Sequence, residues 1–210
     1  MLPESWYNIG RPLDFDRERG AAVKQTFAEL IEDCPVIAAV KDPEGLEQSL
    51  RAEGNIIFVL YGDLMNIPEI VDRIKESGKT AMVHVDLIAG LTSREIAVEF
   101  IQRHTGADGI ITTKPALVKK ASELGLYTVL RHFIIDSMAL SNIERQNDSV
   151  HPDVIEILPG VMPKIIRKIC TLSRVPVIAG GLITDKEDVM GALSAGAAAI
   201  SSTNPDVWFL

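Results

Sequence analysis

The residues with the clearest chemical signature lie near the C-terminus, where two aliphatic runs end in small side chains. The first run ends in the pair Gly180 and Gly181, and the second ends in Ser201 and Ser202. Glycine lets a ligand approach bare backbone N–H groups, and serine hydroxyls add further donors. Backbone N–H groups gathered after a strand are a common way to hold an anion. These four residues therefore predict a phosphate-binding site, which names a class of ligand and leaves the chemistry open.

Charged side chains stand at the ends of several other aliphatic runs. Lys41, Asp86, Arg131 and Glu156 each occupy such an end. A charge in a strand that is covered on both faces is costly unless it is paired. Asp86, Arg131 and Glu156 are therefore expected either to form an ion network or to hold a polar ligand. In the second case, Asp86 and Glu156 accept hydrogen bonds from ligand hydroxyl groups, and Arg131 or Lys41 balances the charge.

Neither a catalytic set nor a metal site can be assigned from motifs. His84 and Asp86 share a face of an expected strand by alternation, but the pair lacks the further ligands that a metal site requires. His84 and His132 are expected to donate structural hydrogen bonds instead. Cys34 and Cys170 are the only cysteines, which indicates neither a zinc site nor a disulfide framework. Nucleophile, Walker and dinucleotide motifs are absent, so no cofactor is predicted.

The composition bounds the class of protein. The chain has 210 residues, of which 47% are hydrophobic and only 5% aromatic, and such an aliphatic core is typical of strands covered on both faces. The net charge of −8 disfavours non-specific nucleic-acid binding and leaves a local basic patch as the remaining route to it. Residues 1–16 lack a basic stretch followed by an apolar run, and no window holds ~18 uninterrupted apolar residues. We expect a cytoplasmic protein that contacts no membrane.

The elements that must position these residues alternate between strand and helix. The aliphatic runs predict strands over Val36–Val40, Ile56–Leu60, Ala81–Asp86, Gly109–Thr112, Thr128–Ile135, Val154–Leu158, Val177–Ala179 and Ala198–Ser201. The segments between them predict helices over Pro43–Arg51, Pro68–Glu76, Arg94–His104, Pro115–Leu124, Met138–Asn147, Met162–Leu172 and Asp185–Ala195. Strict alternation of this kind indicates a parallel sheet in an α/β fold.

The number of repeats decides between an open and a closed sheet. Eight strand–helix units favour a TIM-like (β/α)8 barrel over an open flavodoxin-like sheet, which usually needs about five strands. The loops after strands seven and eight of such a barrel carry its phosphate site, in agreement with the glycine and serine pairs. We predict one compact barrel over residues 35–210. Residues 1–34 are predicted as an N-terminal extension, in which the amphipathic segment Asp16–Ile31 forms a helix that caps the bottom of the barrel.

Several segments together resemble a known family. They are Met82–Ile88 with Gly90, Asp108–Thr113, Arg131 with Phe133 and Asp136, Asp153–Gly160, Ala179–Ile183 and Ser201–Thr203. This series is similar to the bacterial glycerol uptake operon antiterminator regulatory proteins, from about Pro35 to Trp208. The resemblance implies a TIM-like barrel that senses glycerol 3-phosphate as an effector. It also implies that the protein then binds the leader mRNA of glycerol-utilisation genes and prevents transcription termination.

An RNA-binding surface has no signature motif in this chain. The densest positive cluster surrounds the sixth helix of the barrel and consists of Lys164, Arg167, Lys168 and Arg174. We predict that it contacts RNA, while an ordinary solvated helix face with charges that complement the helix dipole is the alternative. A second cluster, around Lys114, is sparser.

Two other functions fit the same scaffold. One is an isomerase, epimerase or lyase of a small phosphorylated polyol, with Asp86 or Glu156 as the base and Lys41 or Lys114 as the electrophile. The other is a transcriptional regulator that acts through protein partners, which would explain the acidic charge without RNA. Association into a homo-oligomer stays open. The fold alone does not separate these functions. We adopt the non-enzymatic, effector-dependent RNA regulator as the first hypothesis.

Overall fold

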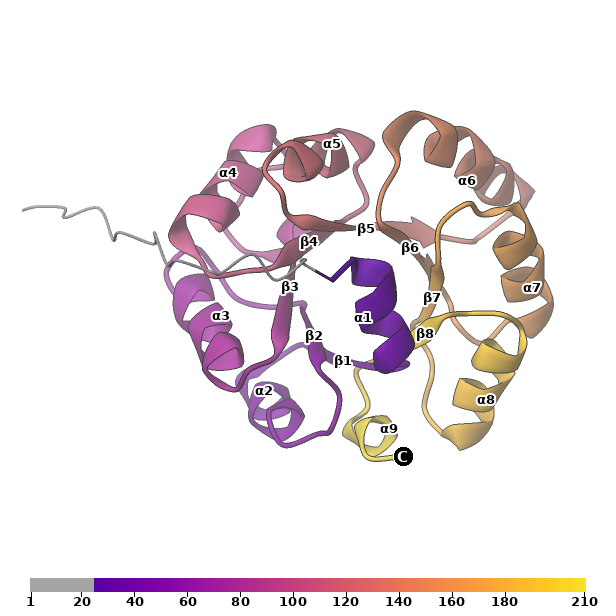
Figure 1. Cartoon of the computed structure of the whole chain (residues 1–210), viewed down its shortest axis with the longest axis horizontal. Coiled ribbons are helices and arrows are strands. Elements are labelled where there is room, and N and C mark those ends of the chain that lie inside the picture. The colour runs from indigo at the N-terminus through magenta and orange to yellow at the C-terminus, as the bar shows by residue number, and fades with distance from the viewer. Residues whose placement is uncertain (1–24) are drawn as a thin grey trace, which may run out of the picture.

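The structure is a computed structural model that describes residues 25–210, apart from the side chains of residues 144–148. Its parallel strands are hydrogen-bonded in chain order and close into a barrel, β1 pairing with β8 (Figure 1). The strands are β1 (Val36–Val40), β2 (Ile56–Val59), β3 (Thr80–His84), β4 (Gly109–Thr112), β5 (Tyr127–Phe133), β6 (Val154–Leu158), β7 (Val177–Gly180) and β8 (Ala199–Ser202). The predicted (β/α)8 barrel is confirmed.

Helices surround the barrel and connect its strands (Figure 1). The connecting helices are α2 (Pro43–Ser49), α3 (Ile67–Glu76), α4 (Glu95–His104), α5 (Pro115–Glu123), α6 (Ser137–Val150), α7 (Pro163–Leu172) and α8 (Lys186–Ser194). Several begin at aspartate caps: Asp42 accepts a hydrogen bond from the N–H of Gly45 at 2.7 Å, and Asp136 accepts one from Ala139 at 2.7 Å. In α2, α3, α5 and α7 a proline occupies the first turn, where its missing N–H costs nothing.

Two short helices lie outside this repeat. Helix α1 (Phe27–Asp33) crosses the N-terminal end of the barrel, and its Phe27 and Ile31 are buried among the side chains that fill the interior (Figure 1). The predicted helix over Asp16–Ile31 lies largely outside the described residues. Within them the helix begins only at Phe27, because the side chain of Thr26 caps it by accepting from the N–H of Glu29. Helix α9 (Pro205–Trp208), which follows β8, has no counterpart in the sequence prediction.

Apolar side chains pack against both faces of the barrel sheet. Inward-facing residues of the strands form the interior, including Ile37, Phe58, Met82 and Val129. Outward-facing residues pack against the connecting helices in two further clusters. This alternation is what a parallel sheet covered on both faces requires.

The strand predicted over Ala81–Asp86 is wrong at its end. Strand β3 stops at His84, and a 3-10 turn, η2, takes over Val85–Leu87. The period of two that placed His84 and Asp86 on one face therefore ends before Asp86 is reached. Among the described residues no helix is long and apolar enough to cross a membrane.

Candidate functional site

A cavity of about 490 Å³ opens at the C-terminal ends of the strands, lined by residues of β1, β5, β6 and β8 and by residues that follow β1, β2, β7 and β8. This volume lies within the range of small-molecule sites. Most of the predicted ligand residues line it, namely Lys41, Arg131, Glu156, Gly181, Ser201 and Ser202. The remaining lining residues are Ala39, Leu60, Leu158, Leu182, Ile183, Thr184, Thr203, Asn204 and Pro205. The closed sheet brings these residues together because the same end of every parallel strand faces this opening.

The floor of the cavity is a buried ion pair. Arg131 and Glu156 are paired in register on β5 and β6, and the guanidinium Nε of Arg131 donates to Oε2 of Glu156 at 2.6 Å. The hydroxyl of Ser201, on β8, donates to the other carboxylate oxygen at 2.6 Å. Glu156 is 0% exposed and Arg131 8%. Arg131 and Glu156 therefore form an ion pair, the first of the two roles predicted for them. Both side chains also line the cavity, where the second role, contact with a ligand, would take place.

Gly180 leaves room for this carboxylate. A Cβ atom at Gly180 would lie 2.5 Å from Oγ of Ser201 and 2.7 Å from Oε1 of Glu156. Both distances are too short for real contacts, so a larger residue would fit only if the side chain of Ser201 or Glu156 shifted. Gly180 is therefore required by the floor, although it does not itself line the cavity.

The loop after β7 turns sharply over the cavity. Gly181 and Leu182 both adopt positive φ, at 75° and 63°. Glycine accepts this conformation readily, whereas a bulky residue such as Leu182 is strained in it. Strained backbone of this kind is concentrated at ligand sites, where the turn points its N–H groups in one direction. The two residues form what we call the β7 turn.

The loop after β8 is braced by hydrogen bonds that the sequence prediction did not include. The hydroxyl of Ser202 donates to the carbonyl of Ile183 at 2.8 Å and accepts from the N–H of Asn204 at 3.0 Å. The indole N–H of Trp208, in α9, donates to the carbonyl of Ser202 at 2.7 Å. The hydroxyl protons of Ser201 and Ser202 are thus both donated to protein acceptors. Further donors for an anion are the backbone N–H groups of these loops and the ammonium of Lys41, which is exposed at the rim.

Asp86 does not line this cavity and forms a cluster with the loop after β4. Its Oδ2 accepts from the N–H and the hydroxyl of Thr113 at 2.8 and 3.1 Å and from the hydroxyl of Thr112 at 3.0 Å. Its Oδ1 is 3.0 Å from the ammonium of Lys114, which also contacts Ser93. Burial alone would raise the pKa of Asp86, but the N–H of Thr113, Lys114 and the two hydroxyls outweigh it and hold the pKa below its usual value.

In each of two histidines one ring nitrogen lacks the structural hydrogen bond predicted for the side chain. Nδ1 of His84 and Nε2 of His132 are buried and have no hydrogen-bond partner in the described part of the chain. Burial lowers the pKa of His132 to about 4. Burial, reinforced by the positive charge of Arg131, lowers the pKa of His84 to about 3, against the opposing effect of Asp86. Both imidazoles are therefore neutral at physiological pH.

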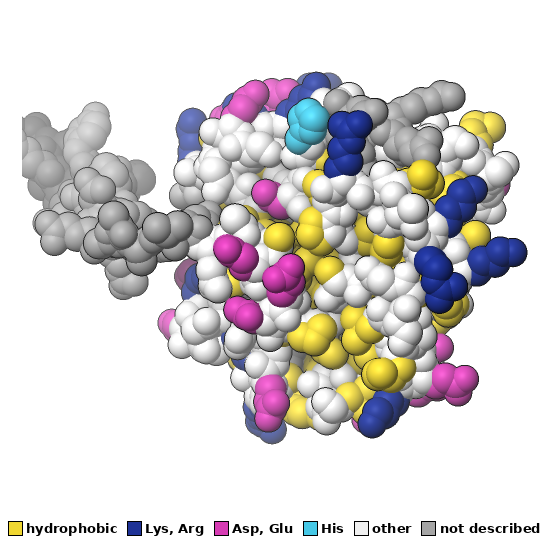
Figure 2. Space-filling model, turned by 45° about the vertical axis from the view of Figure 1, so that its right-hand side comes forward, with side chains coloured by type: hydrophobic (Ala, Val, Ile, Leu, Met, Phe, Trp, Pro, Cys, Tyr) yellow, Lys and Arg dark blue, Asp and Glu magenta, His cyan; other side chains and the backbone are white. Residues whose placement is uncertain are grey.

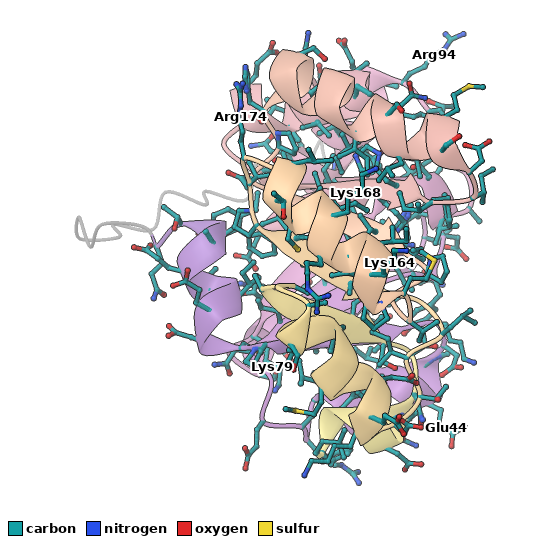
Figure 3. All side chains as sticks on the ribbon, turned by 90° about the vertical axis from the view of Figure 1, so that its right-hand side faces the viewer. Glu44, Lys79, Arg94, Lys164, Lys168 and Arg174 are labelled. Carbon is teal, nitrogen blue, oxygen red and sulfur yellow. The ribbon has the colours of Figure 1, made fainter. Side chains whose placement is uncertain are left out.

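The predicted RNA-binding residues lie on the outer side of the barrel. Lys164, Arg167 and Lys168 are exposed on α7, and exposed Arg174 follows the helix. Figure 3 shows Lys164, Lys168 and Arg174 spread along the length of α7. The described residues include no carboxylate that forms a salt bridge with Lys164, Arg167 or Lys168.

Positive side chains gather at one edge of this side of the molecule. In the space-filling view, which brings the side of α6 to α8 forward, several Lys and Arg side chains lie along the right-hand edge, with Asp and Glu side chains at its lower end, and a group of Asp and Glu side chains lies left of centre (Figure 2). A hydrophobic area separates the two groups. A local positive surface can therefore exist on a chain with a net charge of −8. Within residues 25–210, no group of three or more His, Cys, Asp or Glu side chains is arranged to hold a metal ion.

Comparison with known proteins agrees with this geometry. A sequence model of the family described as glycerol-3-phosphate responsive antiterminator matches residues 36–208. The uncharacterized protein YgcP of Escherichia coli (strain K12) is 45% identical over 181 residues, which cover 86% of this chain and 95% of that protein.

Solved structures add the fold. The crystal structure of a glycerol uptake operon antiterminator regulatory protein from Listeria monocytogenes str. 4b F2365 is 31% identical, with a TM-score of 0.78, and the match covers 80% of this chain and 91% of that one. That of a glycerol uptake operon antiterminator-related protein from Thermotoga maritima MSB8 is 34% identical, with a TM-score of 0.74, over 83% and 98% of the two chains. More distant barrels, at 20% identity or less, include enzymes and show the fold alone.

Proposed function

The chain belongs to the glycerol-3-phosphate responsive antiterminator family, and from this premise we propose that it binds glycerol 3-phosphate in the barrel cavity and acts on RNA as a transcription antiterminator. Leader mRNA of glycerol-utilisation genes is the proposed RNA partner. The proposal has a ligand part and an RNA part, and each is supported by different residues.

The cavity is the single observation that carries the ligand part. It offers the backbone of the β7 turn, the loop after β8 and the ammonium of Lys41 to a phosphate group. Its floor offers the paired Arg131 and Glu156 to hydroxyl groups. Charged groups that are already paired still accept or donate further hydrogen bonds, because a carboxylate has about four acceptor sites and a guanidinium five donors. A small phosphorylated polyol matches both halves of this lining.

The RNA part is supported by the positive side chains of α7, which we call the α7 patch: Lys164, Arg167, Lys168 and Arg174. Phosphate neutralisation supplies most of the affinity of proteins for nucleic acids. On an acidic chain this affinity must come from a local surface, and the α7 patch lies on the outer side of the barrel (Figure 3). Ligand and RNA would then occupy separate sites. Coupling between two binding sites is reciprocal. RNA therefore raises the affinity for glycerol 3-phosphate by the same factor by which glycerol 3-phosphate raises the affinity for RNA.

The carboxylates that an enzyme on this scaffold would use as bases are engaged in other interactions. Glu156 receives hydrogen bonds from Arg131 and Ser201, and Asp86 is paired with Lys114. A general base must reach the proton that it removes, and both carboxylates already accept hydrogen bonds from protein donors. These contacts favour a sensor of the phosphorylated polyol over an isomerase, epimerase or lyase.

The deciding experiment is a binding assay of the pure protein against a leader RNA, with and without glycerol 3-phosphate, across a salt series. The double variant Arg167→Glu/Lys168→Glu should reduce RNA affinity by at least tenfold and leave glycerol 3-phosphate affinity unchanged, because α7 lies outside the cavity. Loss of these phosphate contacts should also flatten the salt dependence of any residual binding.

A matched control is Arg51→Glu/Arg94→Glu, which changes the net charge equally at exposed positions away from α7. Equal loss of RNA affinity in both double variants would show a general charge effect and would remove the α7 patch from the proposal. Turnover of a phosphorylated polyol by the wild type, with no RNA binding in either condition, would replace the regulator by an enzyme.

A further inference from the structure

Four large apolar side chains are exposed close together at the C-terminal end of the barrel. Phe133, Ile135 and Met138 lie on the segment that runs from the end of β5 into α6, and they are 53%, 84% and 69% exposed. Leu182, in the β7 turn, is 71% exposed. A group of exposed large apolar side chains is unusual on a monomeric protein and marks a surface that another molecule covers. We call these four residues the β5–β7 surface.

Backbone contacts show that the two parts of this surface are neighbours. Phe133 is paired in register with Leu158 on β6, and the N–H of Ile134 donates to the carbonyl of Leu158 at 2.8 Å. On the other side of β6, the N–H of Gly160 donates to the carbonyl of Gly181 at 2.9 Å. The end of β6 and the loop that follows it therefore join the two parts, and this loop leads directly into α7.

The positive side chains of the α7 patch begin beside this surface. Lys164 follows the first residue of α7, and Arg167 and Lys168 come after it on the outer side of the barrel (Figure 3). In the described part of the chain, none of the three forms a salt bridge. The carboxylates next to the surface, Asp136 and Asp185, cap the first turns of α6 and α8. The surface therefore has exposed positive charge along the edge formed by α7.

Apolar side chains beside positive charge suit single-stranded RNA. Proteins that bind unpaired nucleotides combine cations that contact the phosphates with aromatic side chains on which the bases stack, and Phe133 supplies an exposed ring here. A base-paired helix hides the faces of its bases and would contact only the positive charges. A second copy of the chain, in an isologous contact, would bring its own α7 patch to the same interface, where like charges repel.

We propose that the β5–β7 surface binds unpaired bases of the RNA whose phosphates the α7 patch holds, with one base stacked on Phe133. This inference rests on the proposed function, since it assumes that RNA binds at α7, and it names the part of the RNA that is recognised. Leu182 also lines the cavity, so RNA on this surface lies beside the opening through which the effector enters. The reciprocal coupling between effector and RNA then has a structural basis at the β7 turn.

The test compares two probes by fluorescence anisotropy in the presence of glycerol 3-phosphate: the leader RNA, and the same RNA annealed to its complementary strand, which leaves no unpaired base. Phe133→Ala should lower the affinity for the leader RNA roughly tenfold, equivalent to about 1.4 kcal/mol, because stacking is lost. Its affinity for the duplex should change less than about twofold. The salt dependence of leader binding should keep the wild-type slope, because no phosphate contact is removed.

The matched control is Met65→Ala. Met65 is 90% exposed in the loop after β2, and β2 lies opposite β6 in the closed strand order. This variant should bind both probes as the wild type does. Ile135→Ala, on the β5–β7 surface, should show the pattern of Phe133→Ala with a smaller loss, since it removes no ring. All three side chains are exposed, so the melting temperatures should stay within about 2 °C of the wild type.

Several outcomes would overturn the inference. They are unchanged leader binding in Phe133→Ala, an equal loss of affinity for the duplex, and an equal loss in Met65→Ala. A wild-type dimer that dissociates in Phe133→Ala, with RNA binding unchanged, would assign the surface to a second copy of the chain instead. Loss of leader binding in Arg167→Glu/Lys168→Glu but not in Phe133→Ala would refute this inference and leave the proposed function standing. Wild-type protein that binds neither probe would refute both this inference and the RNA part of the proposed function.

Discussion

Substitution of Glu156 by Gln tests whether the ion pair holds the floor of the cavity together. Gln has nearly the same shape, so its carbonyl oxygen can still accept from Nε of Arg131, and the hydroxyl of Ser201 can rotate to accept from the new amide. What disappears is the negative charge beside a guanidinium that is 8% exposed. Removing one partner of a buried pair typically costs 3–5 kcal/mol, and we expect about 3 kcal/mol because the hydrogen bonds persist.

For a chain of this size, 3 kcal/mol corresponds to a fall in melting temperature of roughly 6–12 °C. Urea unfolding of the ligand-free protein, followed by circular dichroism, measures the same loss as a lower midpoint with an unchanged slope. The matched control is the double variant Arg131→Met/Glu156→Leu, which replaces both charges by apolar side chains. Because such replacements are often neutral, its stability should return to within about 1 kcal/mol of the wild type.

Two results would refute the reasoning. A Glu156→Gln variant within about 0.5 kcal/mol of the wild type would show that Arg131 is adequately solvated without its partner. A double variant as unstable as the single variant would show that the cost comes from packing at this layer and not from an uncompensated charge.

Two further predictions follow from the polar residues around the cavity. The pKa values of His84 and His132 are lowered to about 3 and about 4, from 6.5, so the unfolded chain binds more protons as the pH falls below 6.5. Stability should be complete above that pH and decline by up to ~1.4 kcal/mol per unit per histidine towards pH 4. His84→Phe should flatten this decline in urea midpoints, and an identical pH profile would contradict the assignment. Asp86→Asn should lower the unfolding free energy by roughly 1–3 kcal/mol. Its affinity for glycerol 3-phosphate should fall less than threefold, because Asp86 does not line the cavity. A larger loss of affinity in titration calorimetry would return Asp86 to the ligand site.

Much of the barrel could be predicted from the sequence, because the residues that begin and end its helices and strands act through local conformational preferences. Pro43 and Pro115 stand in the first turn of helices, a position that proline favours in any fold, and the aliphatic runs between such signals indicate strands. The gathering of Arg131, Glu156, Gly181 and Ser201 around one cavity could also be predicted. It needs only the rule that the C-terminal ends of parallel strands meet at one edge.

The partners of the polar side chains could not be predicted in this way. Whether Glu156 pairs with Arg131 or stays free for a ligand depends on the register of β5 against β6, which brings the two side chains to 2.6 Å. The place of Asp86 depended on where β3 stops, since a change from strand to 3-10 turn after His84 redirects every later side chain. The bracing of Ser202 by Trp208 depended on a short helix without periodicity of its own.

The sequence by itself thus determined the order of the elements and the end of the barrel that carries chemistry, because both depend on local propensity and on the direction of the strands. The tertiary structure alone decided which polar atoms are satisfied and which are left over. Hydrogen bonds join residues distant in sequence and require distances within a few tenths of an ångström. The unpartnered nitrogen of His84 is visible only once every neighbouring donor and acceptor has been placed.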